Sequence, residues 1–352
     1  MIDKSTYHEQ EKIEKTIRLR ELMSELPPYV TDYFRANEAS TSVNSRISYA
    51  YDLKVFFQFL QSKNPDIGKH PIRGITLAML SELKLIDFEE YQEHLKLYNA
   101  TDTDKTLTNG AQGISRKLSS LRSLFSFLYK HEMIAENITE KIQMPKIHDK
   151  AIIQLDPDEI ALLLDYIEDC GKDLSPHKLV YYKKTAKRDF AIFTLLLGTG
   201  IRVSECVGLD INDVDFKSNG LRIIRKGGNE MIVYFGSEVC SALESYLEER
   251  TKVTPITGHE NALFLSMQKK RISVAAVENL VKKYTEATVQ LKKITPHKLR
   301  STYGTNLYRE TGDIYLVADV LGHSDVNTTK KHYAKNADDR RRAAASAVRL
   351  RE

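Results

Sequence analysis

The sequence predicts a mainly α-helical protein in two parts, with a small antiparallel sheet in the second part only. Two observations support this prediction. In the first 150 residues, apolar side chains recur at helical spacing and no alternating strand pattern appears. Between residues 221 and 234, two apolar runs flank a Gly-Gly pair, which predicts a β-hairpin. At 352 residues, the chain is long enough for two domains, each with a core of its own.

The N-terminal part is expected to be a helical bundle. Its expected helices are 8–25, 41–61, 84–97 and 112–131. Between the last two lies a polar stretch, 99–105, which is expected to be a loop. Inward apolar positions repeat every three or four residues in the two longest segments, at Ile47, Ala50, Leu53, Phe57 and Leu60, and at Ile114, Leu118, Leu121, Phe125 and Leu128. Pro27 and Pro28 end the first helix and begin a short apolar run.

A short polar segment that carries a proline, 144–150, predicts the boundary between the two parts. We expect an N-terminal domain of residues 1–147 and a second domain of residues 148–352.

The second domain is expected to be a mixed α/β domain, mostly helical with a small antiparallel sheet. A helix-start signature at 155–159 leads into an expected helix at 160–167. In chain order, the other expected elements are a buried helix at 191–197, a turn at 210–215, the hairpin with Lys226 at its tip, a helix at 237–250, a short strand at 262–265, helices at 273–290 and 296–310, and a helical stretch at 319–333 with a turn at Gly322.

Composition sets wide bounds on function. The net charge of +4 does not by itself indicate a nucleic-acid binder, although basic residues cluster at 292–293, 330–331 and 340–342. The three cysteines lack metal-ligand or redox spacing and are typical of a reducing cytosol. No apolar span approaches membrane length and no signal core opens the chain, so we expect a cytoplasmic protein without a membrane partner.

The most chemically distinctive stretch is 294–335. His297 and Arg300 are three residues apart, so on a helix both project from one face. Thr295 suits the N-cap and Pro296 the first turn, which puts both residues at a helix start. A helix start favours anions, and an arginine can hold two phosphate oxygens. A capped helix with a surface His and Arg is the alternative interpretation.

Four motifs and one tyrosine, taken together, favour the anion-binding interpretation over the capped surface helix. They are Gly-Thr-Gly-Ile-Arg-Val-Ser-Glu at 198–205, Lys-Gly-Gly-Asn-Glu at 226–230, His-Lys-Leu-Arg at 297–300, Leu-Gly-His at 321–323, and Tyr333. In this order and at these separations, they resemble the active site of the tyrosine recombinases. The resemblance covers residues from about 41 to 335 and is strong in 190–335. It implies that the second domain is catalytic, with catalytic residues Arg202, Lys226, His297, Arg300, His323 and Tyr333, and Glu205 in support.

The chemistry of phosphodiester cleavage fits these residue types. Arg202 and Arg300 are permanently charged forks that can stabilise the phosphate oxygens. Tyr333 is the implied nucleophile, His297 its base, and His323 a hydrogen-bond donor to the phosphate. Lys226 is the implied acid for the leaving 5′-oxygen.

Three other residues bear on this assignment. Arg225, next to Lys226, is not excluded as the acid by spacing alone. Tyr333 lies ten positions after His323, where many members of the family have nine and several integrases of mobile elements have ten. Tyr303 and Tyr308 do not match the nucleophile position.

The resemblance also implies partners and a role for the N-terminal domain. Double-stranded DNA is the substrate, no cofactor is needed, and two duplexes recombine through a Holliday junction in a homotetramer. The helices at 48–60 and 115–125 look like those of the core-binding domain of the family. Basic residues there would hold phosphates, although on charge alone a solvated surface is the simpler interpretation. The residues concerned are Arg46, Lys54, Arg116, Lys117 and Arg122.

Within the family, the N-terminal helix and the segment 26–30 are similar to the XerS type of the Xer branch. That type resolves chromosome dimers without a second recombinase, and so implies a role in chromosome partition and cell division. The alternatives are an integrase of a phage or conjugative element, a type IB topoisomerase, and a catalytically silent DNA-binding module. The last is disfavoured because all six catalytic positions carry competent residue types.

The tail, residues 334–352, predicts a helix. Acidic residues precede an alanine-rich run and basic residues lie toward its end, as suits a helix dipole. A frayed terminus is the alternative. In related recombinases this segment docks into the neighbouring protomer, which implies tail exchange within the tetramer.

Overall fold

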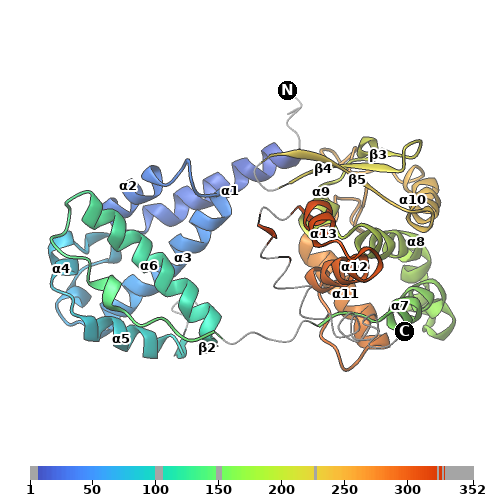
Figure 1. Ribbon diagram of the computed structural model, residues 1–352. Helices are drawn as coiled ribbons and strands as arrows, with labels where there is room; N and C mark the ends of the chain where they lie inside the picture. The colour runs from blue at the N-terminus through green and yellow to red at the C-terminus, as the bar shows by residue number, and fades with distance from the viewer. Residues whose placement is uncertain are drawn as a thin grey trace, which may run out of the picture. The chain divides into compact units, whose positions relative to one another are not determined.

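The computed structural model describes residues 7–99, 106–147, 153–225 and 228–322, together with residues 325, 326 and 329. The chain divides into two compact units, residues 1–150 and 151–352 (Figure 1). The sequence predicted the boundary after residue 147. Within the described ranges, no helix is both long enough and apolar enough to cross a bilayer.

The first unit is a helical bundle with one small hairpin. Its helices are α1 (Tyr7–Ser24), α2 (Pro28–Ala36), α3 (Val43–Lys63), α4 (Leu77–Ser81), α5 (Leu85–His94) and α6 (Ala111–Lys130), with 3₁₀ turns η1 (Ile67–Lys69), η2 (Ile72–Gly74) and η3 (Ile138–Lys141). Its strands are β1 (Leu97–Asn99) and β2 (Thr106–Thr108). The four predicted helices are confirmed as α1, α3, α5 and α6.

Aromatic side chains from three of these helices fill the centre of the first unit. Phe56 of α3 stacks on Phe88 of α5 with ring centroids 5.7 Å apart, and Phe88 meets Phe125 of α6 edge-on at 5.4 Å. All three rings are buried. Because each ring buries a large apolar area, this contact holds α3, α5 and α6 together.

The hairpin β1–β2 contradicts the expectation that the first unit has no strand. Its strands pair antiparallel, with Leu97 opposite Thr108 and Asn99 opposite Thr106. Most of its described side chains are exposed. Only Tyr98 packs partly against the core of this unit, so apolar alternation is too weak to predict these strands, and backbone pairing decides the structure.

The second unit combines helices with a three-stranded sheet. Its helices are α7 (Pro157–Asp169), α8 (Pro176–Thr199), α9 (Val203–Gly208), α10 (Ser237–Arg250), α11 (Val274–Thr288), α12 (Pro296–Thr311) and α13 (Ile314–Leu321), with 3₁₀ turns η4 (Cys170–Asp173) and η5 (Ile211–Asp213). Its strands are β3 (Val214–Asp215), β4 (Gly220–Ile224) and β5 (Glu230–Tyr234), paired antiparallel in that order. The mixed, mostly helical fold and the predicted hairpin, now β4–β5, are confirmed.

Helix α8 is the centre of the second unit. It packs against α7, α10 and α12 (Figure 1). The predicted buried stretch 191–197 is its C-terminal half, and Ile192, Phe193 and Leu195 are fully buried. Because α8 packs against several neighbouring helices, the position of its C-terminal end is fixed by these contacts. The candidate site begins at that end.

The strand expected at 262–265 is not formed. Ala262 makes an isolated bridge to Asp210, and Leu265 makes one to Arg271. All four residues of the run are buried. The apolar run reflects burial in the core, which periodicity alone cannot distinguish from a strand.

One basic side chain of the first unit does not face outward as expected. Lys117 of α6 is 7% exposed, and its Nζ lies 3.0 Å from Oδ1 of Asp52 of α3, which is itself 1% exposed. Arg116 pairs with the other carboxylate oxygen. Burial raises the pKa of Asp52, and its two cations act in the opposite direction. The α3–α6 contact therefore contains a buried carboxylate held between two basic groups.

We expect Asp52→Ala to lower the free energy of unfolding of the first unit by about 3–5 kcal/mol, because it leaves the buried Lys117 ammonium without its partner. Far-UV circular dichroism during urea unfolding measures this effect. Asp66→Asn is the matched control, since Asp66 pairs with Lys69 on the exposed surface and should change the transition little. Equal transitions for the two variants would contradict a structural role for the buried pair.

Candidate active site

The site begins where α8 ends. Gly200 terminates α8 with φ +63°, in the left-handed region that favours glycine. A Cβ at this position would lie 2.4 Å from Cδ1 of Tyr303 in α12 and 3.0 Å from Cδ2 of Leu321 in α13. Glycine therefore lets α12 and α13 pack directly on the end of α8, and brings the motif at 198–205 up to the motif at 297–300.

Arg202 and Glu205 form a local pair at the start of α9. The Arg202 backbone N–H donates to Oε2 of Glu205 at 2.7 Å, and Nη1 donates to Oε1 at 2.9 Å. The Glu205 side chain is 4% exposed, whereas that of Arg202 is 36% exposed. The buried carboxylate thus orients a guanidinium that solvent can still reach.

Arg300 lies inside the unit on α12 and is 4% exposed. Its Nη1 donates to the carbonyl of Gly200, and its Nη2 donates to the carbonyl of Leu321. His297, three residues earlier, is exposed. Thr295 and Pro296 occupy the predicted N-cap and first position of the helix, although the Thr295 side chain makes no capping bond.

Helix α13 ends at Gly322, whose φ of +61° is also left-handed. A helix C-terminus has carbonyl groups without partners in the helix and carries partial negative charge. Here arginines from three other elements approach these carbonyls. Arg225 donates from Nη2 to Val320 at 2.7 Å, and Arg202 makes a longer contact to Gly322 at 3.5 Å.

Arg202, Arg225 and Arg300 therefore form an arginine cluster at the end of α13, with Glu205 as a nearby carboxylate (Figure 1 shows α9, α12 and α13). Burial lowers the pKa of Arg225; Glu205 raises it and Arg202 lowers it. Gathering like charges is unfavourable, and a bound anion relieves that repulsion. The arrangement can hold a phosphate group, and the Arg202 side chain, 36% exposed, is open to solvent.

The structure thus brings together Arg202, Glu205 and Arg300, which were predicted from distant motifs, and places His297 on the same helix as Arg300. Lys226, His323, Tyr333 and the tail lie outside the described residues. Their assignments stay predictions. Tyr303 packs over Gly200, and burial raises its pKa, which makes its phenol a poor nucleophile.

The contact of Arg225 with α13 was missed by sequence reasoning, which weighed this residue only as an alternative acid. No local signal could have revealed the contact, because Val320 lies 95 residues further along the chain. The adjacent Gly-Gly turn indicated a hairpin, but not where its side chains lie.

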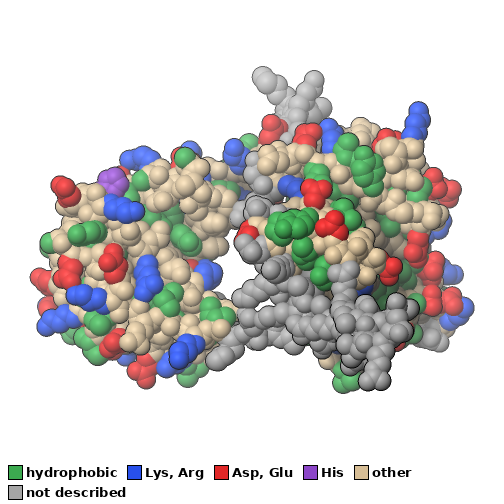
Figure 2. Space-filling model, in the orientation of Figure 1, with side chains coloured by type: hydrophobic (Ala, Val, Ile, Leu, Met, Phe, Trp, Pro, Cys, Tyr) green, Lys and Arg blue, Asp and Glu red, His purple; other side chains and the backbone are tan. Residues whose placement is uncertain are grey.

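The five predicted DNA-binding residues all make contacts within their own unit. Besides the Asp52 pairs, Arg46 pairs with Glu38, Lys54 pairs with Glu25, and Arg122 donates to backbone carbonyls of residues 139 and 142. Side-chain exposure is 48% for Arg116, 20% for Lys54 and 13% for Arg46. On the face shown in Figure 2, basic and acidic side chains are interspersed over both units.

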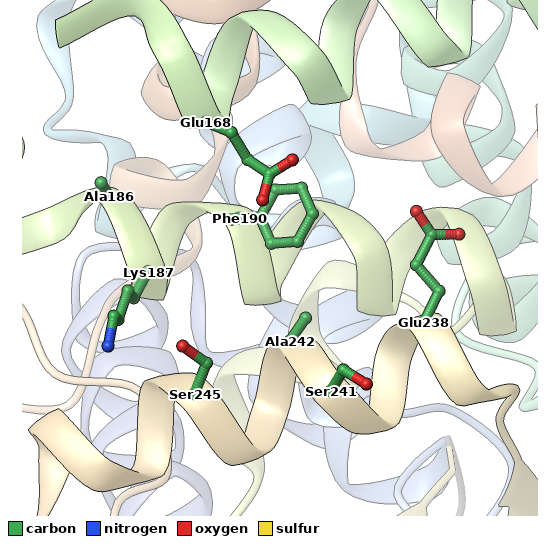
Figure 3. Close-up of a pocket in the computed structure, with 8 residues that line it drawn as sticks. All are labelled: Glu168, Ala186, Lys187, Phe190, Glu238, Ser241, Ala242 and Ser245. Carbon is green, nitrogen blue, oxygen red and sulfur yellow. The ribbon is translucent and has the colours of Figure 1, made fainter.

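A pocket of about 560 Å³ lies among α7, α8 and α10 (Figure 3). Glu168, Glu238 and Lys187 are among its lining residues, and burial, followed by Asp165 and Glu238, raises the pKa of Glu168. Two carboxylates repel phosphate, so this pocket is unsuited to DNA. Among the described residues, no group of three or more His, Cys, Asp or Glu side chains is arranged to hold a metal ion.

Comparison with known proteins identifies the family. Residues 154–340 match the model of the phage integrase family. The chain belongs to this family, that of the tyrosine recombinases. It is 33% identical over 312 residues to the tyrosine recombinase XerC of Caldanaerobacter subterraneus subsp. tengcongensis, across 86% of this chain and 82% of that protein. It is also 30% identical over 333 residues to the tyrosine recombinase XerS of Lactococcus lactis subsp. cremoris, across 88% of this chain and 92% of that protein.

Solved recombinase structures share the fold. The Tn1549 transposon integrase in complex with transposon right end DNA superposes with a TM-score of 0.64 at 20% identity, over 91% of this chain and 97% of that one. The match to the family and to these relatives shows that this protein is a site-specific recombinase.

We expect Glu205→Ala to slow DNA cleavage by this recombinase on the order of 10²-fold while leaving DNA binding nearly unchanged, because Arg202 loses the carboxylate that orients it. Glu205→Gln, which keeps an acceptor for the Arg202 backbone, should lose less. Covalent-adduct formation on a nicked suicide substrate measures the rate, and a gel shift measures binding. Glu286→Ala, from the exposed Lys282 pair, is the control. Glu205→Ala that cleaves as fast as this control would show that Glu205 does not orient the site.

Proposed function

We propose that this recombinase resolves chromosome dimers as an Xer enzyme of the XerS type, acting without a second recombinase. The observation that supports this role is the match to XerS relatives, which extends over 92% of the Lactococcus protein rather than the catalytic part alone. The features of the sequence that are similar to this type are the N-terminal helix, now α1, and the segment 26–30, which leads into α2. An integrase of a mobile element is the competing role.

The proposed reaction is a metal-free transesterification. The Tyr333 oxygen attacks the scissile phosphorus while its proton passes to His297. The bond from phosphorus to the 5′-oxygen breaks, and Lys226 gives that oxygen a proton. The products are a 3′-phosphotyrosine and a free 5′-hydroxyl, and attack by the partner strand's 5′-hydroxyl reverses both steps.

Charge stabilisation in this scheme comes from two members of the arginine cluster. Arg202 and Arg300 hold the non-bridging oxygens of the phosphate, with a further hydrogen bond from His323. The support for this assignment is that Arg202 and Arg300, 98 positions apart in the sequence, both contact the end of α13, which directly precedes His323. A fixed guanidinium needs no reorganisation when charge develops on the phosphate.

The first unit is proposed to hold the duplex as the core-binding domain, and the second to act as the catalytic domain. Contacts to phosphates fix position more than sequence. Arg116 is the best placed of the five predicted residues, because about half of its side chain is exposed. Lys117 serves the α3–α6 contact instead. Strand exchange between two duplexes proceeds through a Holliday junction in a homotetramer in the cytoplasm.

The proposed role predicts that the purified protein alone recombines a plasmid carrying two copies of its native chromosomal site, and forms a covalent adduct on a nicked version of that site. Tyr333→Phe should bind the site with near-normal affinity and form no adduct, because the ring stays and the attacking oxygen is lost.

Each other result points to a different conclusion. Adduct formation by Tyr333→Phe would move the nucleophile to another tyrosine. Relaxation of supercoils without recombinants would indicate a topoisomerase. A native site found only at the ends of an element, beside excision genes, would indicate an integrase.

The tail is proposed to pack in trans on the neighbouring protomer and so to link assembly to activity. Deleting the residues after Asp338 should leave half-site binding largely intact and weaken cooperative binding and recombination, because the trans contact is lost. A gel-shift titration on the full site measures cooperativity, with the intact chain as control. Undiminished cooperativity in the truncated protein would contradict tail exchange.

A further inference from the structure

Arg225 closes the turn between β4 and β5. Its backbone N–H donates to the carbonyl of Asn229 at 2.8 Å, and its own carbonyl accepts from the N–H of Gly228 at 3.0 Å. Lys226 follows Arg225 directly in the sequence. A contact that fixes Arg225 therefore also fixes the strand end that enters the turn.

The side chain of Arg225 is held by α13. Its Nη2 donates to the carbonyl of Val320 at 2.7 Å. A Cβ at Gly322 would lie 1.1 Å from Nη1 and 2.1 Å from Cζ of the same guanidinium. The group therefore lies against the bare backbone of Gly322, in space that any other residue would fill. Glycine at this position is needed both for its φ of +61° and for this contact.

The chemistry of this contact requires arginine rather than any cation. A planar guanidinium can lie flat on a peptide while it donates sideways to a carbonyl, whereas an ammonium is a compact point charge. The neighbouring charges, Glu205, Asp319 and Arg202, offset one another in part. The hydrogen bond to the Val320 carbonyl and the close fit against Gly322 indicate that Arg225 fixes the position of the turn relative to α13.

We propose that Arg225 is a positioning residue that ties the turn carrying Lys226 to the end of α13. The same three carbonyl positions, 320 to 322, receive Arg225, Arg300 and Arg202. The strand end that enters the turn is thereby fixed by the helix end that also contacts Arg202 and Arg300. This inference rests on the proposed function, in which Lys226 protonates the leaving oxygen.

A substrate with sulfur at the 5′-bridging position separates positioning of the acid from other effects, because a thiolate leaves without protonation. On normal DNA, Lys226→Ala should slow cleavage by about 10²–10⁴-fold, the usual contribution of a general acid. Arg225→Ala should slow it by about 10–10²-fold through misplacement of Lys226. On the sulfur substrate both variants should recover most of the wild-type rate, and half-site binding should be unchanged throughout.

The double variant Arg225→Ala/Lys226→Ala decides whether one residue acts through the other. It should cleave normal DNA no more slowly than Lys226→Ala alone. Losses that multiply, or an Arg225→Ala rate equal to wild type, would overturn the proposal. Rescue of Arg225→Ala without rescue of Lys226→Ala would also overturn it, by making Arg225 the acid. If wild-type protein forms no adduct at all, the proposed function fails instead.

Two matched variants test the contact itself. Arg222→Ala removes an arginine of β4, the strand that leads to Arg225; the Arg222 side chain is 56% exposed and pairs with Asp213, and this variant should cleave like wild type. Gly322→Ala should displace the Arg225 guanidinium and slow cleavage. Its effect should be several-fold smaller when Arg225 is already alanine, because the clash is then absent. Equal effects of Gly322→Ala in both backgrounds would show that the fit at Gly322 does not position the turn.

Discussion

The end of α13 is the feature on which the candidate site depends. Its last carbonyls are hydrogen-bonded by arginines from the β4 end, from the start of α9 and from α12. A helix terminus needs partners for its carbonyls, and guanidinium groups satisfy them while complementing the helix dipole. One helix end thereby sets the positions of groups that lie far apart in the chain.

This arrangement relies on the packing beneath it. Helix α8 is surrounded by α7, α10 and α12, and it stops at Gly200. Because Gly200 has no side chain, Tyr303 and Leu321 approach its backbone closely. A methyl group there would push α12 and α13 away and would separate Arg300 from Gly200, whose carbonyl it contacts. The glycines of the site are therefore as constrained as its charged residues.

In the first unit, charge is used largely for structure. Asp52 holds Arg116 and Lys117, and Arg122 binds backbone carbonyls. Lys117 is removed from water and therefore requires a partner, which the Asp52 carboxylate supplies. Basic residue types on a helix thus say little about which surface meets DNA, because the same side chains can hold two helices together.

Local sequence patterns were sufficient to predict the helices with strong apolar periodicity, the Gly-Gly hairpin, and the residue types of the site in family order. It failed where burial and periodicity disagree: exposed β1 and β2 show no alternation, buried 262–265 is no strand, and Lys117 points inward. The contact of Arg225 with Val320, and the space that Gly322 leaves for it, became visible in the folded chain alone. Those contacts join residues about a hundred positions apart, and local spacing carries no information about such distances.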